Sequence, residues 1–252
     1  MTRPRAPLRI AAVQCVARQG DIAGTATEHA AQIDAAADSG ASVVLFPELS
    51  LTGYEPEMID LHGLRIAVDD PVLRPILLMC RQRKVHALIG APTGSGVLPQ
   101  IGVLHVDSSG AVRVAYAKQH LQIGEIGIFS AGSAGSAGSA GAVLEIGGWG
   151  LALSVGADAG VGSHPVAARS AGADAYLVGA LYLIGAEHRI DEQMRKAAAV
   201  GLWTVLAQYS GGTGGGPACG LSGGWRPDGT EVVRLGAGPG MAIVDLTVPP
   251  AL

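Results

Sequence analysis

The sequence predicts an α/β fold, and two observations support this. Short apolar runs rich in β-formers alternate with alanine-rich segments of helical length, as in strands joined by helices. Hydrophobic residues make up 48% of the 252-residue chain and charged residues only 15%. A chain of this length can bury a sizeable core in one large domain or two small ones.

The N-terminal segments follow this alternation. The apolar run at 8–17 predicts a first strand. The alanine-rich segment at 25–41 predicts a helix that Gly40 closes. The segment at 42–48 is apolar until Pro47, which indicates a buried strand.

The next part of the chain adds a helix, a strand and a hairpin. The segment at 72–85 has helical spacing, and the apolar run at 86–92 predicts another strand. The segment at 102–118 predicts a hairpin, because the residues DSSG at 107–110 supply turn chemistry between two alternating runs.

A further strand–helix alternation follows. The run at 151–158 predicts a strand that enters a glycine-rich turn. A helix with proline in its first turn is expected at 164–173, and a strand at 174–182. The segment at 186–201 predicts a helix with acids early and bases late, as the helix dipole favours.

The last segments predict a strand at 202–210, a mobile glycine loop at 211–216 and a closing hairpin through 226–235. The segment at 130–142 repeats Ser, Ala and Gly, whose small side chains bury little surface, so we expect a flexible loop there. Because the strand signals on both sides suit one sheet system, we expect a single domain over 1–252.

Charge and hydropathy exclude several partners. The formal net charge is −4 and the pI about 5.9, which gives no electrostatic footprint for nucleic acid or an anionic membrane. No apolar run approaches the roughly 18 residues of a membrane span. The N-terminal apolar patch is too short for a secretory signal, so a cytoplasmic protein is expected.

The cysteines and histidines predict neither a disulfide framework nor a metal site. Cys15, Cys80 and Cys219 are widely spaced and odd in number. The histidines also lack the spacing of metal ligands. We therefore expect no metal and no cofactor.

Three ionisable residues stand at the ends of otherwise apolar segments: Glu48, Lys118 and Glu125. A carboxylate buried at a strand end is costly unless it is paired, and desolvation raises its pKa toward that of a general base. A nearby lysine would keep it charged and could stabilise an oxyanion. The same residues also fit a purely structural Glu–Lys ion pair, and spacing leaves both interpretations open.

At these residues the chain resembles the nitrilase-like carbon–nitrogen hydrolases. The stretch LFPELSLTGYEP matches a motif of that family and makes Glu48 the counterpart of its general base. The stretch YAKQHL makes Lys118 the counterpart of its oxyanion-stabilising lysine. Glu125 matches a further glutamate that helps to position the substrate.

The third family motif, a cysteine in a C-x-D turn before a helix, is matched by LALSVGADAGVGSHP except at one position. Gly156 stands where the nucleophilic cysteine is expected. The resemblance covers nearly the whole chain. It implies a four-layer α-β-β-α sandwich, a homodimer formed through helices, and a small amide- or nitrile-like ligand. Glu48, Lys118, Glu125 and Gly156 are the expected catalytic positions.

No nearby residue supplies an obvious replacement for the thiol. Ser154 lies about 6–7 Å back along the strand and would need activation. Asp158 fits a turn cap or a partner for a base, and Ser163 fits a helix N-cap. Cys219 lies in a glycine-rich stretch but fits a buried filler role.

Three hypotheses follow. In the first, the protein keeps the fold and pocket but lacks the covalent thioester route, and it binds a ligand or partner. In the second, Glu48 and Lys118 perform acid–base chemistry without covalent catalysis, as in a lyase, a cyclase or direct hydrolysis by water. In the third, Gly156 is an engineered or sequencing change in an ordinary amidase.

Three further residues are expected to bind the ligand. Tyr54 and Tyr182 each lie a few residues beyond a predicted strand end, and Ala157 follows Gly156. The two tyrosines suit the wall of a pocket, although both also fit ordinary packing.

Overall fold

The computed structural model describes residues 5–133 and 143–248. Their strands form one hydrogen-bonded path in the order β5-β4-β3-β2-β1-β9-β8-β7-β6. Among the described strands, backbone pairing joins the two halves of this path at β1 and β9, where Cys15 pairs with Tyr209 and Val16 with Ser210. The path therefore divides into two sheet layers.

The first layer contains the N-terminal strands and the last strand of the chain. Parallel pairs join β1 to β2 and β2 to β3, whereas β3, β4 and β5 form an antiparallel meander and β13 pairs antiparallel with β1. The strands are β1 (Leu8–Val16), β2 (Val43–Leu45), β3 (His86–Thr93), β4 (Gln100–Val106), β5 (Val112–Ala117) and β13 (Gly240–Leu246).

The second layer is built around the parallel strands β7, β8 and β9. Antiparallel strands flank this parallel centre. The strands are β6 (Val143–Ile146), β7 (Trp149–Val155), β8 (Ala175–Ala180), β9 (Trp203–Thr213), β10 (Gly216–Cys219), β11 (Gly223–Trp225) and β12 (Glu231–Arg234).

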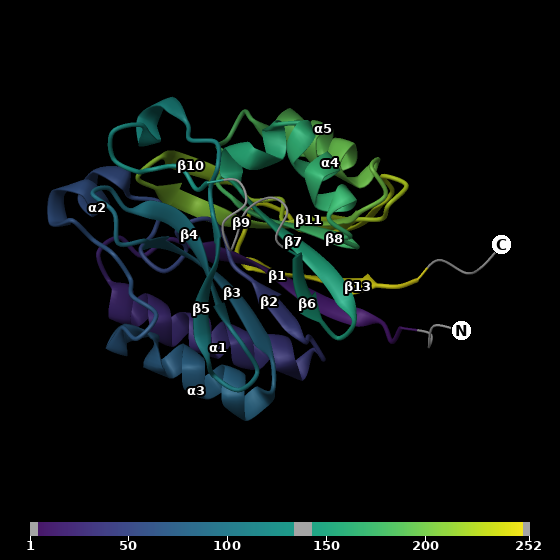
Figure 1. The fold of residues 1–252 in the computed structure, drawn as a ribbon, viewed down its shortest axis with the longest axis horizontal. Helices are drawn as coiled ribbons and strands as arrows, with labels where there is room; N and C mark the ends of the chain where they lie inside the picture. Colours follow the sequence, from purple (N-terminus) through teal and green to yellow (C-terminus); the bar gives the residue numbers. More distant parts are fainter. Residues whose placement is uncertain (1–4, 134–142, 249–252) are drawn as a thin grey trace.

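Helices cover both outer faces. Figure 1 shows α1 and α3 along one side of the strands and α4 and α5 along the opposite side. The α-helices are α1 (Ile22–Asp38), α2 (Pro56–His62), α3 (Arg74–Arg83), α4 (Ser163–Ser170) and α5 (Glu187–Ala198). Short 3-10 turns are η1 (Pro71–Leu73), η2 (Ile123–Glu125) and η3 (Gly156–Gly160). The predicted α/β class and the four layers, α-β-β-α, are confirmed.

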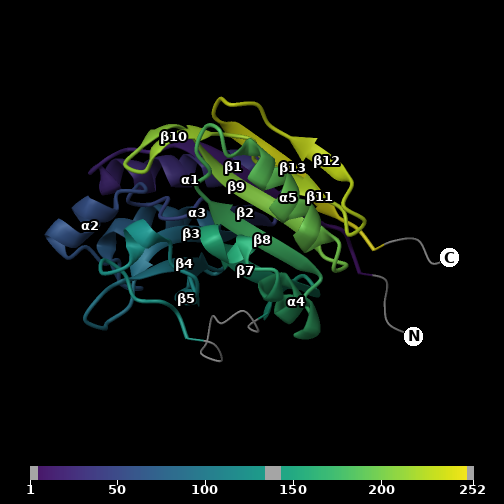
Figure 2. The ribbon, with the colours of Figure 1, turned by 90° about the horizontal axis from the view of Figure 1, so that it is seen from above.

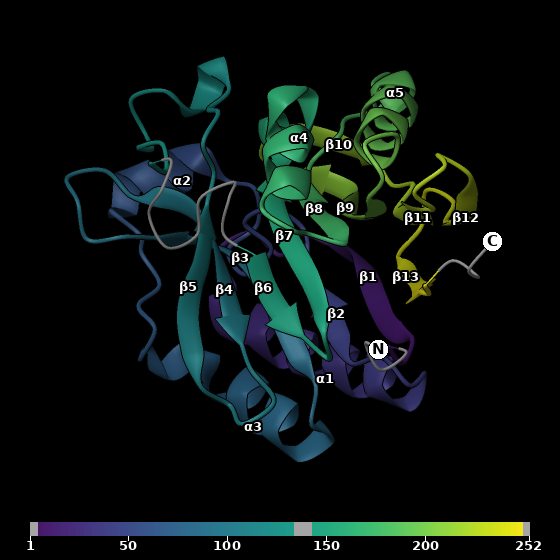
Figure 3. The same cartoon turned by 45° about the vertical axis from the view of Figure 1, so that its right-hand side comes forward.

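Two apolar clusters hold these layers together. The larger one joins α1 and α3 to the first sheet layer and continues into the second layer. The smaller one packs α5 against β8 and β9, with Ile190 and Met194 fully buried. Figures 2 and 3 show β5 and β7 near each other although they belong to different layers, and the two strands are in contact. This contact brings the ends of both strands to the candidate site.

Several predicted boundaries change. The strand predicted at 42–48 ends at Leu45, because Pro47 lacks an N–H and the chain turns there. The glycine loop predicted at 211–216 instead contributes the end of β9 and the start of β10, which pair as a hairpin. Of the predicted flexible loop at 130–142, residues 134–142 lie outside the described residues.

Candidate active site

Glu48 lies in a backbone turn that follows β2. The next residue, Leu49, has a φ of 52°, in the left-handed region that non-glycine residues rarely occupy. The hydroxyl of Tyr209 donates a hydrogen bond to the carbonyl oxygen of Glu48 at 2.9 Å. Strained backbone persists where its surroundings fix it and is frequent at functional sites.

Gly90 on β3 lets this turn approach the sheet. A Cβ at Gly90 would lie 2.3 Å from the carbonyl oxygen of Pro47 and 2.4 Å from the amide nitrogen of Leu49. Any side chain at this position would therefore displace the turn that presents Glu48. Glycine permits the close backbone approach.

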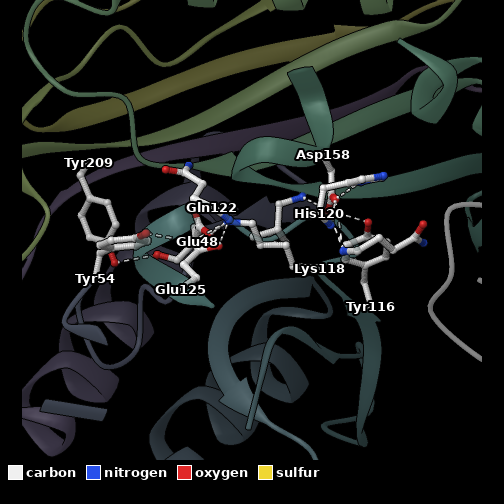
Figure 4. Close-up of polar contacts among 11 residues, drawn as sticks. Glu48, Tyr54, Tyr116, Lys118, His120, Gln122, Glu125, Asp158 and Tyr209 are labelled. Carbon is white, nitrogen blue, oxygen red and sulfur yellow. Dashed lines mark hydrogen bonds and ion pairs between the residues drawn. The ribbon is translucent and has the colours of Figure 1, made fainter. Parts of the chain in front are cut away.

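Lys118 follows β5 and joins two carboxylates (Figure 4). Its Nζ donates to Oε1 of Glu48 and to Oε1 of Glu125, each at 2.6 Å. All three side chains are 0% exposed. We call Glu48, Lys118 and Glu125 the charged triad. One ammonium thus pairs with two carboxylates away from water.

The charged triad has an uneven charge balance. Burial raises the pKa of Glu48 to about 7, although Lys118 acts in the opposite direction. Burial by itself lowers the pKa of Lys118, but attraction to Glu48 and Glu125 outweighs it and the pKa is raised. Lys118 is therefore charged at neutral pH, and Glu48 can exchange a proton in that range.

Glu125 is held by neighbours besides Lys118. The hydroxyl of Tyr54 donates to its Oε1, and the backbone N–H of Gln122 donates to its Oε2, both at 2.8 Å. Both of its oxygens thus have partners. Because both of its oxygens are held by hydrogen bonds, Glu125 is suited to positioning Lys118.

Gly156 begins η3, directly after β7, and faces the charged triad. A Cβ at Gly156 would lie 2.5 Å from Oε2 of Glu48 and 3.0 Å from Nζ of Lys118. Its φ of 48° is left-handed, which glycine adopts without a Cβ penalty. Oε2 of Glu48 is buried and has no hydrogen-bond partner among the described residues. The structure thus brings Glu48, Lys118, Glu125 and Gly156 together.

Asp158 ties the Gly156 turn to the segment that carries Lys118. Its carboxylate accepts from the hydroxyl of Tyr116 at 2.6 Å and from the backbone N–H of His120 at 2.8 Å. It also lies 2.8 Å from Nδ1 of His120 and accepts weakly from the N–H of Val155. Figure 4 shows this cluster beside the charged triad. Asp158 is buried, so these donors replace water around it.

A buried hydrogen-bond chain extends from Asp158 toward α4. Tyr116 contacts Nε2 of His164 at 2.8 Å, and Nδ1 of His164 contacts the hydroxyl of Tyr176 at 2.8 Å. Since the hydroxyl of Tyr116 donates to Asp158, Nε2 of His164 carries the hydrogen. Burial lowers the pKa of His164, which is consistent with a neutral ring.

Two cavities lie next to these residues. Gly156, Ala157 and Tyr182 line a cavity of about 130 Å³. Tyr54 lines a larger cavity of about 340 Å³. All three predicted binding residues therefore lie on cavity walls, and Tyr54 also contacts the charged triad.

The other nucleophile candidates are placed elsewhere. The predicted N-cap role of Ser163 is wrong, because Gly162 occupies the cap position and Ser163 is the first residue of α4. Burial raises the pKa of Cys15 and Cys80 to about 12, and it also raises the pKa of Cys219. Ser154 is buried within β7. None of the cysteine thiols among residues 5–133 and 143–248 is therefore exposed or activated as a nucleophile.

The described residues contain neither a metal-binding cluster nor a membrane-spanning helix. In residues 5–133 and 143–248, no group of three or more His, Cys, Asp or Glu side chains could hold a metal ion. Over the same ranges, no helix is long and apolar enough to cross a membrane.

The carbon-nitrogen hydrolase family model matches residues 9–249. The chain belongs to the carbon-nitrogen hydrolase family. The resemblance seen at Glu48, Lys118 and Glu125 thus extends over almost the whole sequence. A comparison with curated protein sequences finds no match.

Solved structures of carbon-nitrogen hydrolases share this fold. Three similar chains are mutants of the amidase from Nesterenkonia sp. AN1. A double mutant in complex with acrylamide is 26% identical, with a TM-score of 0.87, and the match covers 98% of this chain and 93% of that chain. A mutant showing Michael addition of acrylamide at the active site cysteine is 27% identical, with a TM-score of 0.85 and coverages of 95% and 93%. A mutant in complex with butyramide is 28% identical, with a TM-score of 0.85 and coverages of 95% and 90%.

Some residues of this carbon-nitrogen hydrolase site were not predicted from its sequence. Tyr116 and His120 flank Lys118 within the stretch YAKQHL, so that motif contained a usable signal. Tyr209 and His164 carry no such signal, because their partners are far away in the sequence. Gln122 contributes its backbone N–H, which sequence does not distinguish.

Proposed function

We propose that this carbon-nitrogen hydrolase-like protein binds a small amide- or nitrile-like ligand without the covalent thioester route. The position of Gly156 carries the proposal, since a side chain there would stand between Glu48 and Lys118. Covalent catalysis in this arrangement requires a nucleophile at that point. Glycine supplies none. In this proposal Gly156 stands where the neighbouring amidase has its active site cysteine.

The remaining groups suit recognition of an amide. Oε2 of Glu48 would accept a hydrogen bond from an amide N–H, a donor that this buried atom does not find among residues 5–133 and 143–248. Nζ of Lys118 would stabilise negative charge on the carbonyl oxygen. The neighbouring amidase binds acrylamide and butyramide, which supports ligands of this size.

One observation favours a second candidate, direct hydrolysis by water. Oε2 of Glu48 has no hydrogen-bond partner in the described part of the chain, and burial raises the pKa of Glu48 to about 7, which suits a general base at neutral pH. Glu48 would take a proton from water as the water oxygen attacks the carbonyl carbon. The electrons of the C=O bond would move to the oxygen near Lys118. The C=O bond would then re-form as the C–N bond breaks, and the proton on Glu48 would pass to the leaving nitrogen. The same pair would also support a lyase or a cyclase.

The two candidates are separated by three measurements with butyramide. Calorimetry measures binding, an ammonia assay measures hydrolysis, and intact-mass spectrometry detects an acyl-enzyme. Binding without ammonia or adduct supports the first candidate, and ammonia without adduct supports the second. An adduct would instead indicate a nucleophile in this chain, and absence of binding and turnover would overturn both candidates. If sequencing of the natural protein shows cysteine at position 156, the protein is an ordinary amidase.

We also propose a single domain over 1–252, a homo-oligomer and a cytoplasmic location. The family match over 9–249 supports the single domain. Ile123 and Ile126 are large apolar side chains that are 93% and 67% exposed. Exposed apolar groups of this kind are suited to an interface between copies. Light scattering on the purified chain tests the oligomeric state.

A further inference from the structure

The larger cavity adjoins the smaller one beside Gly156. Gln122, Leu181 and Leu183 line both, so the two spaces meet at these side chains. The smaller cavity provides space beside the amide-binding groups. The larger one provides about 340 Å³ for the rest of a ligand.

The larger cavity is acidic. Glu55 and Glu57 line it, and its lining contains no lysine, arginine or histidine. Glu55 is 7% exposed and accepts from two neutral donors, the N–H of Gly214 at 2.8 Å and Nε2 of Gln19 at 3.2 Å. Among the described residues, no cationic nitrogen lies within ion-pair distance of Glu55. A buried carboxylate without a counter-ion favours a cationic partner.

The opposite charge lines the smaller cavity. Arg189 is one of its lining residues, together with Gly156 and Ala157. An ammonium group would be repelled there and attracted toward Glu55. The charges therefore define a direction across the two adjoining cavities, with the cationic end of a ligand away from Gly156.

A second, independent observation concerns the other end of the ligand. Oε2 of Glu48 is buried and unpartnered among the described residues, and it lies 2.5 Å from the point that a Cβ at Gly156 would occupy. Gly156 itself lines the smaller cavity. This atom requires a hydrogen-bond donor on the Gly156 side. An amide N–H is such a donor, and it leaves the acidic cavity to receive a different group.

We propose that the ligand is an aliphatic amide whose other end carries a primary ammonium group. The amide lies against Gly156, Glu48 and Lys118. The aliphatic linker passes Leu181 and Leu183, and the ammonium binds Glu55, with Glu57 nearby. This inference rests on the proposed amide-binding function and adds the substrate class.

Three amides of matched length test the inference: butyramide, 4-aminobutyramide and succinamate, which are neutral, cationic and anionic at pH 7. Calorimetry at low salt should show 4-aminobutyramide binding about tenfold or more tightly than butyramide, as expected for one charge-assisted contact. Succinamate should bind most weakly. Added salt should reduce the preference for the cation.

Substitutions locate the preference. Glu55→Gln keeps the shape and an acceptor for Gly214, and should reduce the preference for 4-aminobutyramide over butyramide to about threefold or less. Glu57→Gln tests the second carboxylate if the first variant is unstable. Asp60→Asn changes the same charge on α2 outside the cavity lining and should keep the full preference.

The outcomes separate the two proposals. If butyramide or succinamate binds as tightly as 4-aminobutyramide, the cationic inference is wrong while the amide-binding function stands. If the preference survives both Glu55→Gln and Glu57→Gln, the assigned site is wrong. If none of the three amides binds, both proposals fail.

Discussion

Oε2 of Glu48 lies 2.5 Å from the point that a Cβ at Gly156 would occupy. This carboxylate oxygen, which has no hydrogen-bond partner among the described residues, and the residue without a side chain therefore face the same small volume. Lys118 lies 3.0 Å from that point. A carboxylate whose pKa burial raises and a lysine ammonium thus both lie beside Gly156, which makes the site testable by substitution.

The first prediction concerns turnover. If the wild-type protein releases ammonia from an amide, Glu48→Gln should reduce the rate by about 100-fold or more, because an amide cannot take a proton. Affinity for butyramide should stay within about threefold, since the side-chain shape is preserved. An unchanged rate in this variant would mean that Glu48 is not the base.

The second prediction concerns stability against pH. Burial raises the pKa of Glu48 to about 7 in the folded protein, compared with the ordinary value of 4.5 that applies to the unfolded chain. Between pH 4.5 and 7, Glu48 is ionised in the unfolded chain and still protonated in the folded protein. Raising the pH through this range therefore lowers the contribution of Glu48 to the free energy of unfolding. The melting temperature of Glu48→Gln minus that of wild type should therefore increase from pH 4.5 to 7 and level off above. Thermal scans at matched ionic strength measure the difference.

The exposed Glu145 supplies the control for this effect. The melting-temperature difference between Glu145→Gln and wild type should stay nearly constant over the same pH range. Taking the difference between variant and wild-type melting temperatures also cancels the pH dependence that comes from histidines whose pKa burial lowers, such as His164, because both proteins contain them. A flat difference for Glu48→Gln would show that its pKa is ordinary.

The third prediction is that Lys118→Met destabilises the fold strongly. The lysine is the cationic partner of Glu48 and Glu125, and all three side chains are 0% exposed. Removing one partner of a buried ion pair costs about 3–5 kcal/mol. Urea unfolding measures the loss. A triple variant with both glutamates changed to Gln should recover much of it, and a loss below about 1 kcal/mol would contradict the buried arrangement.

The charged triad was predictable because each member lies within a short local motif. Glu48, Lys118 and Glu125 end apolar segments, and strand ends gather at one edge of a sheet. The position of Gly156 at the site was also predictable, because it lies within the short motif LALSVGADAGVGSHP. The turn at Leu49 was not, since leucine gives no signal for a left-handed conformation that Tyr209 and Gly90 impose through tertiary contacts.

The cavities also depend on features that sequence patterns do not reveal. The short helix α2, at Pro56–His62, buries only Ile59 and so has little periodicity. It nevertheless places Glu57 on a cavity wall. The hairpin of β9 and β10 brings Gly214 to Glu55, and its glycines suggested a loop rather than a pair of strands.

The fourth prediction tests Tyr116 as a positioning residue. Its hydroxyl connects Asp158 to His164 in a fully buried setting. Tyr116→Phe leaves the N–H of His164 without an acceptor, and should destabilise the fold by about 1–3 kcal/mol. It should also weaken butyramide binding, because Asp158 links the Lys118 and Gly156 segments.

Tyr182→Phe is the matched comparison for Tyr116→Phe. The hydroxyl of Tyr182 donates to the partly exposed Gln193, so its loss should cost less stability. If both variants lose the same stability and bind butyramide as wild type does, Tyr116 has no special positioning role.

The last prediction restores a thiol at the site with Gly156→Cys. The φ of 48° and the 2.5 Å approach to Glu48 require adjustment, and the backbone conformation costs about 1–3 kcal/mol. Gly156→Ala measures this cost without a thiol. The side chain of Glu48 can move at its far end, so we expect a folded but less stable protein.

In the folded Gly156→Cys protein, the ammonium of Lys118 should lower the pKa of the new thiol below its free value of about 8.5. Glu48 opposes ionisation by charge but can accept the proton directly. The new thiol should react with iodoacetamide faster than the buried Cys15, Cys80 and Cys219, and traces of ammonia should appear from butyramide. Ala157→Cys places a thiol on the same cavity wall one residue further along. If the thiol at position 156 reacts no faster than the thiol at position 157 in folded proteins, the charged triad does not activate a nucleophile there. Gly156 would then occupy a position whose neighbours do not support covalent amide hydrolysis.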